Sequence, residues 1–238
     1  MARPLALLIH SGGFGGRQWR KLAELLAPTH DVLAPDLIGY GEPWPAGKPF
    51  HFRQDVERLA AMLDRPADVV GHSYGGFLAL QLALARPDLV DRLAVYDPVA
   101  FTVLTPEERV RGFAGIKAQY ELPLDEAWLA AFVDWWNGPG AWAKLPEPTR
   151  EAFRKVGWKC SEEVATLMAD YETDYSRVRA PTLVLGGGKS PEAERLTVER
   201  LARVIPHAEL QMFEDLGHMG PIVAAERVNA AIALSLRR

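Results

Sequence analysis

Ser73 is the residue whose setting most clearly predicts chemistry. It lies in Gly71-His72-Ser73-Tyr74-Gly75, a Gly-x-Ser-x-Gly pattern followed by Gly76. The apolar run Ala67–Val70 precedes the pattern and a helix-like apolar run follows it, so the motif falls on a strand-to-helix turn. Such a turn holds the serine in a strained backbone conformation, and the glycines leave room for the chain to cross itself. Ser73 is therefore predicted to be a nucleophile, the alternative being an ordinary serine in a glycine-rich turn.

A serine hydroxyl is a poor nucleophile near neutral pH and needs a base that accepts its proton. Histidine suits this task, and His218 follows the last predicted strand, at the end where open α/β sheets place their sites. Gly217 and Gly220 allow its loop to approach the serine turn. We therefore expect His218 to be the base. His72 is expected to point away from the reacting centre, and three histidines in connecting segments are expected at the surface: His30, His51 and His207.

Short apolar runs alternate with longer helical patterns along the chain, which predicts βα units and a parallel sheet. The predicted strands are Leu5–Ile9, Asp31–Ala34, Ala67–Val70, Leu93–Tyr96, Thr182–Leu185 and Glu209–Phe213. The predicted helices between them are Gln18–Leu26, Phe52–Leu63, Tyr74–Arg86, Pro191–Val204 and Ala224–Leu236. Several strands are apolar on consecutive residues, as expected for strands buried on both faces.

The alternation breaks between Phe101 and Ser176, where the pattern predicts helices only. Thr105-Pro106-Glu107-Glu108 is a capping box with proline at the first helical position. Asp125, Ser161 and the stretch from Pro146 to Thr149 are further predicted helix starts. An insertion of about 75 residues is too long for a connection. We therefore predict a core domain of residues 1–100 and 177–238 and a helical cap subdomain of residues 101–176.

The composition limits the partners of the chain. Its 238 residues fit one α/β domain, and its net charge of −4 is spread without the basic stripe that nucleic acid needs or a patch for anionic lipid. The apolar run at the start is too short for a secretory signal or a membrane span. The single cysteine suits a reducing compartment, so a cytoplasmic protein with a small-molecule substrate is expected.

No cofactor or metal is expected either. The sequence shows no cluster with metal-ligand spacing, and Gly186-Gly187-Gly188-Lys189-Ser190 lacks the spacing of a phosphate-binding loop. The oligomeric state has no signal in the sequence.

Three further motifs resemble those of the α/β-hydrolase fold superfamily, in its serine hydrolase branch. His10-Ser11-Gly12-Gly13-Phe14-Gly15 resembles the His-Gly-x oxyanion loop, with Ser11 replacing the usual glycine. Asp36-Leu37-Ile38-Gly39-Tyr40-Gly41 resembles the structural Asp-x-x-Gly-x-Gly turn, and Gly217-His218 matches the place of the catalytic histidine. The resemblance covers nearly the whole chain. It implies an α/β-hydrolase fold, here with a reduced, mostly or wholly parallel six-stranded sheet flanked by helices and a helical cap after the fourth strand.

The resemblance also implies an acid that orients the histidine. Family members most often carry it at about the position of Ser190, where this chain has no carboxylate. A known variation places the acid after the strand that follows the elbow helix, and Asp97 stands there. Asp97 is the first candidate, although many relatives carry a structural Asp-Pro at this place. Glu192 or Glu194 is the second, and a chain without a functional acid is the third.

Two oxyanion donors are implied as well, the backbone N–H groups of Gly12 and Tyr74. An aromatic-rich stretch of the insertion is expected to hold the cap together, and some of its side chains to line an apolar pocket. This stretch contains Trp128, Phe132, Trp135, Trp136 and Trp142. Such a pocket favours a hydrophobic acyl or aromatic substrate over a sugar or a nucleotide.

The resemblance therefore implies a cofactor-free hydrolase of small, largely apolar carboxylic esters, or of related lactones or thioesters, acting through an acyl-enzyme on Ser73. Two alternatives stay open: a C–C bond hydrolase or acyltransferase of the same fold, and a non-catalytic ligand-binding protein. A serine at position 73 counts against epoxide hydrolases and haloalkane dehalogenases, which need a carboxylate nucleophile.

Overall fold

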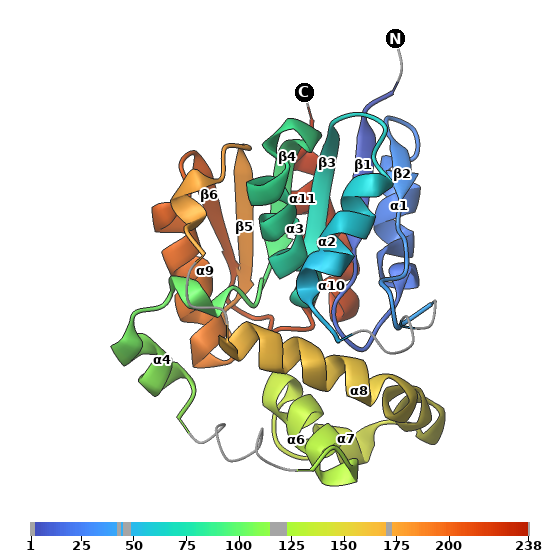
Figure 1. Ribbon diagram of the computed structural model, residues 1–238, viewed down its shortest axis with the longest axis vertical. Coiled ribbons are helices and arrows are strands. Elements are labelled where there is room, and N and C mark those ends of the chain that lie inside the picture. Colours follow the sequence, from blue (N-terminus) through green and yellow to red (C-terminus); the bar gives the residue numbers. More distant parts are fainter. Residues whose placement is uncertain (1–2, 42–43, 45–48, 115–122, 170–172, 238) are drawn as a thin grey trace.

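Six parallel strands form one sheet in the order β2-β1-β3-β4-β5-β6 (Figure 1). The computed structural model describes residues 3–41, 44, 49–114, 123–169 and 173–237. The strands are β1 (Leu5–Ile9), β2 (Asp31–Leu33), β3 (Ala67–His72), β4 (Val90–Tyr96), β5 (Thr182–Gly187) and β6 (Ala208–Phe213). The predicted strands and the parallel six-stranded sheet are confirmed.

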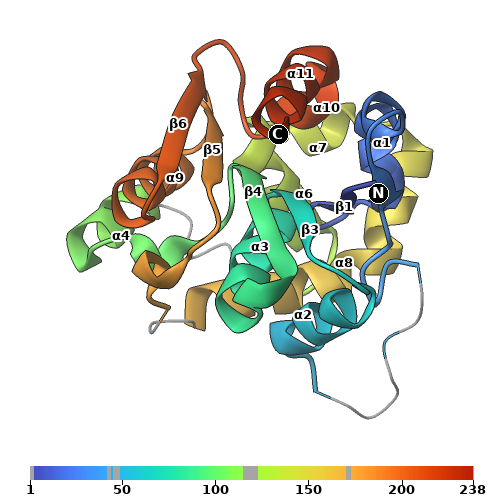
Figure 2. The ribbon, with the colours of Figure 1, turned by 90° about the horizontal axis from the view of Figure 1, so that it is seen from above.

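Helices cover both faces of this sheet (Figure 2). Leu5, Leu7 and Ile9 of β1 belong to a buried cluster with α2 (Phe52–Ala61), α3 (Tyr74–Ala85) and α9 (Glu192–Val204). Ala6 and Leu8 belong to a second cluster, with α1 (Arg20–Leu26) and α11 (Ala225–Ser235). Because both faces are buried, the strands have apolar side chains on consecutive residues. Short helices complete the core: η1 (Gly16–Trp19), η2 (Pro87–Leu89), η3 (Phe101–Val103), η4 (Tyr175–Arg177) and α10 (Gly220–Val223).

Further helices are inserted between β4 and β5: α4 (Pro106–Gly112), α6 (Glu126–Asn137), α7 (Ala141–Lys144) and α8 (Glu147–Ala169). The last three lie across the end of the sheet at which the strands finish, whereas α4 lies beside α9 (Figure 1). α6, α7 and α8 share a cluster of buried apolar side chains of their own. The division into a core domain and a cap subdomain stays a prediction, and residues 115–122 and 170–172 of the insertion lie outside the described residues.

Three predicted helix starts in the insertion are seen, among them the stretch from Pro146 to Thr149, where α8 begins at Glu147, and one is wrong. Thr105 and Glu108 form the expected reciprocal capping box of α4, and the Asp125 side chain caps α6. Ser161, however, lies inside α8, which runs for 23 residues without a break. Buried apolar residues before and after Ser161 keep α8 packed on one face, and this packing outweighs the preference of serine for helix starts. Among the described helices, none is both long and apolar enough to cross a bilayer.

Candidate active site

Ser73 stands at the turn between β3 and α3 in a conformation that side-chain-bearing residues rarely adopt, with φ 55° and ψ −122°. Its N–H donates to the carbonyl of Tyr96 on β4 at 3.0 Å. The flanking glycines are sterically required. A Cβ on Gly71 would lie 2.2 Å from the Gly75 carbonyl oxygen, and a Cβ on Gly75 would lie 2.3 Å from that of Ile9. The glycines of the Gly-x-Ser-x-Gly pattern are therefore needed because the backbone segments pass too close to one another here for a side chain.

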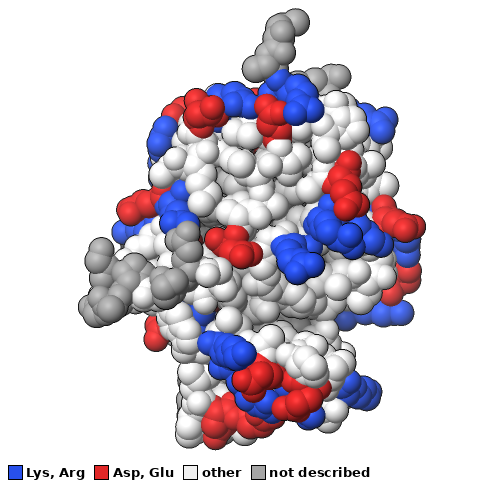
Figure 3. All heavy atoms as spheres, turned by 90° about the vertical axis from the view of Figure 1, so that its right-hand side faces the viewer, with Lys and Arg blue, Asp and Glu red and all other residues white. Residues whose placement is uncertain are grey.

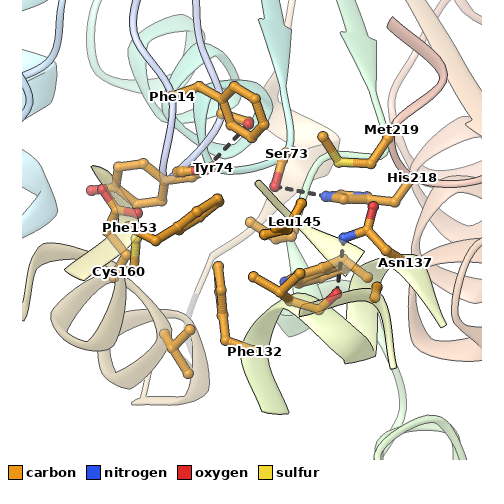
Figure 4. A pocket seen from close by; sticks show the side chains of 18 of the residues that line it. Phe14, Ser73, Tyr74, Phe132, Asn137, Leu145, Phe153, Cys160, His218 and Met219 are labelled. Atoms are coloured by element: carbon orange, nitrogen blue, oxygen red, sulfur yellow. Dashed lines mark hydrogen bonds between the residues drawn. The ribbon is translucent and has the colours of Figure 1, made fainter. Parts of the chain in front are cut away.

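The structure brings Ser73, His218 and Asp97 together, although they come from three separate parts of the chain. His218 lies in the loop between β6 and α10, and its Nε2 is 3.0 Å from Ser73 Oγ (Figure 4). Its Nδ1 is 3.2 Å from Oδ2 of Asp97, which directly follows β4. A carboxylate beside Nδ1 keeps the ring proton there, which leaves Nε2 free to accept the serine proton. All three side chains are buried.

Both carboxylate oxygens of Asp97 have hydrogen-bond donors. Oδ1 accepts from the Gly187 N–H at 3.1 Å, and Oδ2 accepts from the Ser190 hydroxyl at 2.5 Å. Such donors stabilise a carboxylate that is fully buried. Ser190 occupies the position at which family members most often carry the acid. In this chain its hydroxyl donates a hydrogen bond to Asp97. Its contribution was missed because a serine there gives no sequence signal of its own.

The structure brings neither alternative acid to His218. Glu192 pairs with Arg111 of α4 at 2.7 Å. Glu194 is fully buried in α9, and this burial, together with the charge of Asp97, raises the pKa of its carboxyl well above the ordinary value. Neither oxygen of Glu194 has a hydrogen-bond partner among the described residues. This setting favours the neutral, protonated form of Glu194.

His10 and His72 are buried and support loops around Ser73. Burial lowers the pKa of His10 to about 4, and its ring accepts from the Leu37 N–H and donates to the Ser11 carbonyl. Burial also lowers the pKa of His72 well below its ordinary value. The His72 ring lies 2.8 Å from the carbonyl oxygen of His218, so it holds the histidine loop from its backbone.

The prediction that His30 lies at the surface is wrong. His30 is buried, and its Nε2 lies 3.2 Å from Oδ2 of Asp68, a buried carboxylate of β3 that needs a donor. His51 is exposed and caps α2, and His207 is exposed as expected.

Gln18 is a residue that sequence reasoning missed. Its side-chain oxygen accepts from the Ser11 N–H at 3.0 Å, and its amide nitrogen lies 3.0 Å from Nδ1 of His72. A chain of hydrogen bonds therefore joins the glycine-rich loop after β1 to the His218 loop. No local pattern marks Gln18, because its partners, Ser11 after β1 and His72 on β3, are far apart in the sequence.

A cavity of about 300 Å³ opens above Ser73 and His218, between the sheet and helices α6 and α8 (Figure 4). The two predicted oxyanion donors, Gly12 and Tyr74, line it with Ser73. Tyr74 is the first residue of α3, so its N–H has no carbonyl partner within the helix. The remaining lining is mainly apolar, with Phe14, Val99, Phe132, Val133, Trp136, Leu145, Phe153, Val164, Leu167 and Met219.

The aromatic side chains of the insertion divide between packing and the cavity. Trp128 and Trp142 are buried in the cluster that α6, α7 and α8 share. Trp136 and Phe132 line the cavity, and the Trp136 ring stacks on the His218 ring with centroids 4.1 Å apart. Trp135 packs edge-on against Trp136. One helix of the insertion thus contacts the histidine directly.

A second buried ionic cluster, which we call the Lys159 cluster, consists of Asp55 on α2 and Lys159 and Glu163 on α8. Lys159 Nζ lies 2.7 Å from Asp55 Oδ2 and 3.3 Å from Glu163 Oε1. The Tyr40 hydroxyl donates to Glu163 Oε2 at 2.9 Å. Burial raises the pKa of Glu163 to about 7. Sequence reasoning missed this cluster as well. Among the described residues, no three His, Cys, Asp or Glu side chains are grouped so as to hold a metal ion.

The chain belongs to the alpha/beta hydrolase family, whose model matches residues 6–231. Lipase LipV of Mycobacterium tuberculosis is 34% identical, over 95% of this chain and 90% of that protein. A 2-hydroxymuconate semialdehyde hydrolase of Pseudomonas putida is 29% identical, over 93% of this chain and 83% of that protein. The crystal structure of the enol-lactonase from Burkholderia xenovorans shares the fold, with a TM-score of 0.75 and 20% sequence identity. The similarity covers 99% of this chain and 92% of that one. The family and its curated members support a hydrolase.

Proposed function

We propose that this protein is a cofactor-free serine hydrolase that cleaves small, largely apolar carboxylic esters or related carbonyl compounds. The observation that carries the proposal is the contact of Ser73 Oγ with His218 Nε2 at 3.0 Å, with Asp97 3.2 Å from the other ring nitrogen. The apolar cavity above this pair supports a substrate with a hydrocarbon acyl group.

In the proposed mechanism, Ser73 Oγ attacks the carbonyl carbon of the ester while His218 Nε2 takes the serine proton. Asp97 stabilises the positive ring that results. The N–H groups of Gly12 and Tyr74 stabilise the negative oxygen of the tetrahedral intermediate. The intermediate collapses, His218 gives its proton to the departing alcohol, and an acyl-enzyme remains. Water then attacks the acyl-enzyme by the same proton transfers and releases the acid.

The inserted helices contribute to this reaction in the same proposal. The described helices of the insertion form a cap, of which α6 and α8 line the cavity. The Trp136 ring covers one face of His218 and shields it from water. The absence of nucleic-acid and membrane partners, like the cytoplasmic location, stays a prediction from the composition. On the face in Figure 3, acidic and basic side chains are interspersed.

Hydrolysis of p-nitrophenyl butyrate tests the proposal. We expect Ser73→Ala to lower kcat/KM by a factor on the order of 10⁴ or more, because no other group supplies the nucleophile. Ser161→Ala, a change of the same kind on α8, is the matched control and retains the rate. If the wild-type protein releases no p-nitrophenol and a fluorophosphonate does not label it, the protein is a non-catalytic binding protein instead.

A second candidate reaction is favoured by the 29% identical 2-hydroxymuconate semialdehyde hydrolase, whose name describes a different substrate class. The same serine and histidine serve C–C bond hydrolysis in this alternative. Faster turnover of that semialdehyde than of any ester would select it.

A further inference from the structure

The cavity above Ser73 has an acidic side chain in its wall and no lysine or arginine to balance it. Glu163 of α8 lines the cavity, and the described lining residues include no lysine or arginine. Lys159, the cation that pairs with Glu163, is fully buried and does not line the cavity. A substrate in the cavity therefore meets the carboxyl of Glu163 without meeting the cation behind it.

The Lys159 cluster contains one more acid than base. The ammonium group of Lys159 lies closer to Asp55, at 2.7 Å, than to Glu163, at 3.3 Å. With all three groups ionised, the cluster carries a net charge of −1, and Glu163 is its member at the cavity wall. A charge in a water-poor cavity acts strongly on another charge nearby.

Glu163 also lies against the loop that is proposed to bind the carbonyl oxygen of the substrate. A Cβ on Gly12 would lie 2.6 Å from Glu163 Oε2. The Tyr40 hydroxyl donates to this same Oε2 and accepts from the Gly13 N–H at 3.0 Å. The negative charge is therefore held next to the reacting end of the cavity, within reach of an acyl group bound there.

We propose that Glu163 is a specificity-determining residue that makes the enzyme select uncharged acyl groups and reject acyl groups that carry a carboxylate. This inference rests on the proposed ester hydrolase. A carboxylate that enters the cavity loses its water and meets the charge of Glu163, without a lysine or arginine in the cavity wall to pair with. The selection also disfavours the C–C hydrolase alternative with a dienoic acid as substrate, since a dienoic acid carries a carboxylate.

Two p-nitrophenyl esters of equal chain length test the proposal: the hexanoate, whose chain ends in a methyl group, and the adipate monoester, whose chain ends in a carboxylate. The readout is the ratio of kcat/KM for the hexanoate to that for the adipate. We expect the wild-type ratio to be about tenfold or more, and Glu163→Gln to lower it by about tenfold. Any effect of the substitution on the Gly12 loop acts on both esters and cancels in the ratio.

Glu162→Gln is the matched control, because Glu162 is the exposed neighbour on α8 and loses the same charge. Its ratio should equal that of the wild type. A ratio that Glu163→Gln leaves unchanged, while Ser73 still supports hydrolysis of the hexanoate, overturns the inference and leaves the proposed function standing. If the wild type hydrolyses neither ester, the proposed function fails, and the inference fails with it.

A second measurement needs no variant. The groups that face Glu163 are Lys159 and Cys160 on α8, Asp55 on α2, Tyr40 after β2 and Tyr74 on α3. Burial raises the pKa of Glu163 to about 7, so the wild-type ratio should shrink between about pH 8 and about pH 6 as Glu163 gains a proton. A ratio that is flat over this range contradicts the inference.

Discussion

The two buried ionic clusters at the cavity differ in how their carboxylates are satisfied. Asp97 accepts from the Gly187 N–H and the Ser190 hydroxyl, which are neutral donors, and it faces His218. Glu163 shares the single cation of its cluster with Asp55. Neutral donors leave the charge of Asp97 available to a ring that becomes positive during a reaction. Burial, together with the charge of Asp55, instead raises the pKa of Glu163 to about 7, so the charge of Glu163 depends on pH.

The comparison teaches that burial alone does not define a catalytic carboxylate. Both Asp97 and Glu163 are almost inaccessible to water. What separates them is the partner: a histidine that contacts a serine in one case, and a lysine held by a second acid in the other. We therefore assign proton transfer to the first cluster and recognition of substrate charge to the second, and each assignment is open to test.

Among the substitutions that test this comparison, Asp97→Asn should change the activity most. An amide in place of the carboxylate does not stabilise the positive histidine ring and favours its wrong tautomer, so kcat should fall by a factor on the order of 10³–10⁴. Steady-state kinetics with p-nitrophenyl butyrate measures it, and Glu192→Gln, which removes a charge that does not contact His218, should have little effect. A large loss in Glu192→Gln with none in Asp97→Asn would move the acid to α9.

Glu163→Gln should change how stability depends on pH. The carboxyl of Glu163 has a pKa of about 7 in the folded chain, above its ordinary value of 4.5, so the folded state binds this proton more tightly. The resulting stability is present in full below about pH 4.5 and is lost as the pH rises through about 7. Relative to the wild type, Glu163→Gln should therefore gain up to about 3 kcal/mol in free energy of unfolding between about pH 5 and about pH 8.

Urea unfolding of both proteins at the two pH values measures this difference, and all other titrating groups cancel in it. A difference that does not vary with pH would mean that Glu163 is ionised over the whole range. The contrast between the two clusters would then lie in their geometry alone.

Ser190→Ala should have the smallest effect. The substitution removes one donor from Asp97 Oδ2 and leaves the Gly187 N–H in place, so kcat should fall by about tenfold. The same ester assay measures it, with Ser235→Ala at the end of α11 as a control. An unchanged kcat would show that the Ser190 hydroxyl does not help to hold the carboxylate in position.

Much of the fold and part of the site follow from local patterns in the sequence. Apolar runs of strand length predicted the parallel sheet, and the glycines around Ser73 predicted the turn. Both predictions were possible because each pattern lies within a few consecutive residues. Asp97 was predicted as the acid only from the resemblance to the α/β-hydrolase family, because its partner His218 is 121 positions away.

Contacts between distant residues were not predictable in this way. Lys159 and Asp55 are 104 positions apart, and charged residues on a helix usually face water, so nothing local marks them as buried partners. His30 was misplaced for the same reason, because its burial depends on Asp68 of β3. Ser161 shows the opposite error. A local preference for helix starts was overruled by the packing of α8 on both sides of it.

Mass spectrometry of the protein after rapid acid quench from p-nitrophenyl acetate tests the central claim most directly. The claim predicts an acetyl group on the peptide that contains Ser73, formed within the first turnover and absent from the Ser73→Ala variant. Steady hydrolysis of the ester with the acetyl group on another residue, or with no covalent adduct at any time, would contradict it.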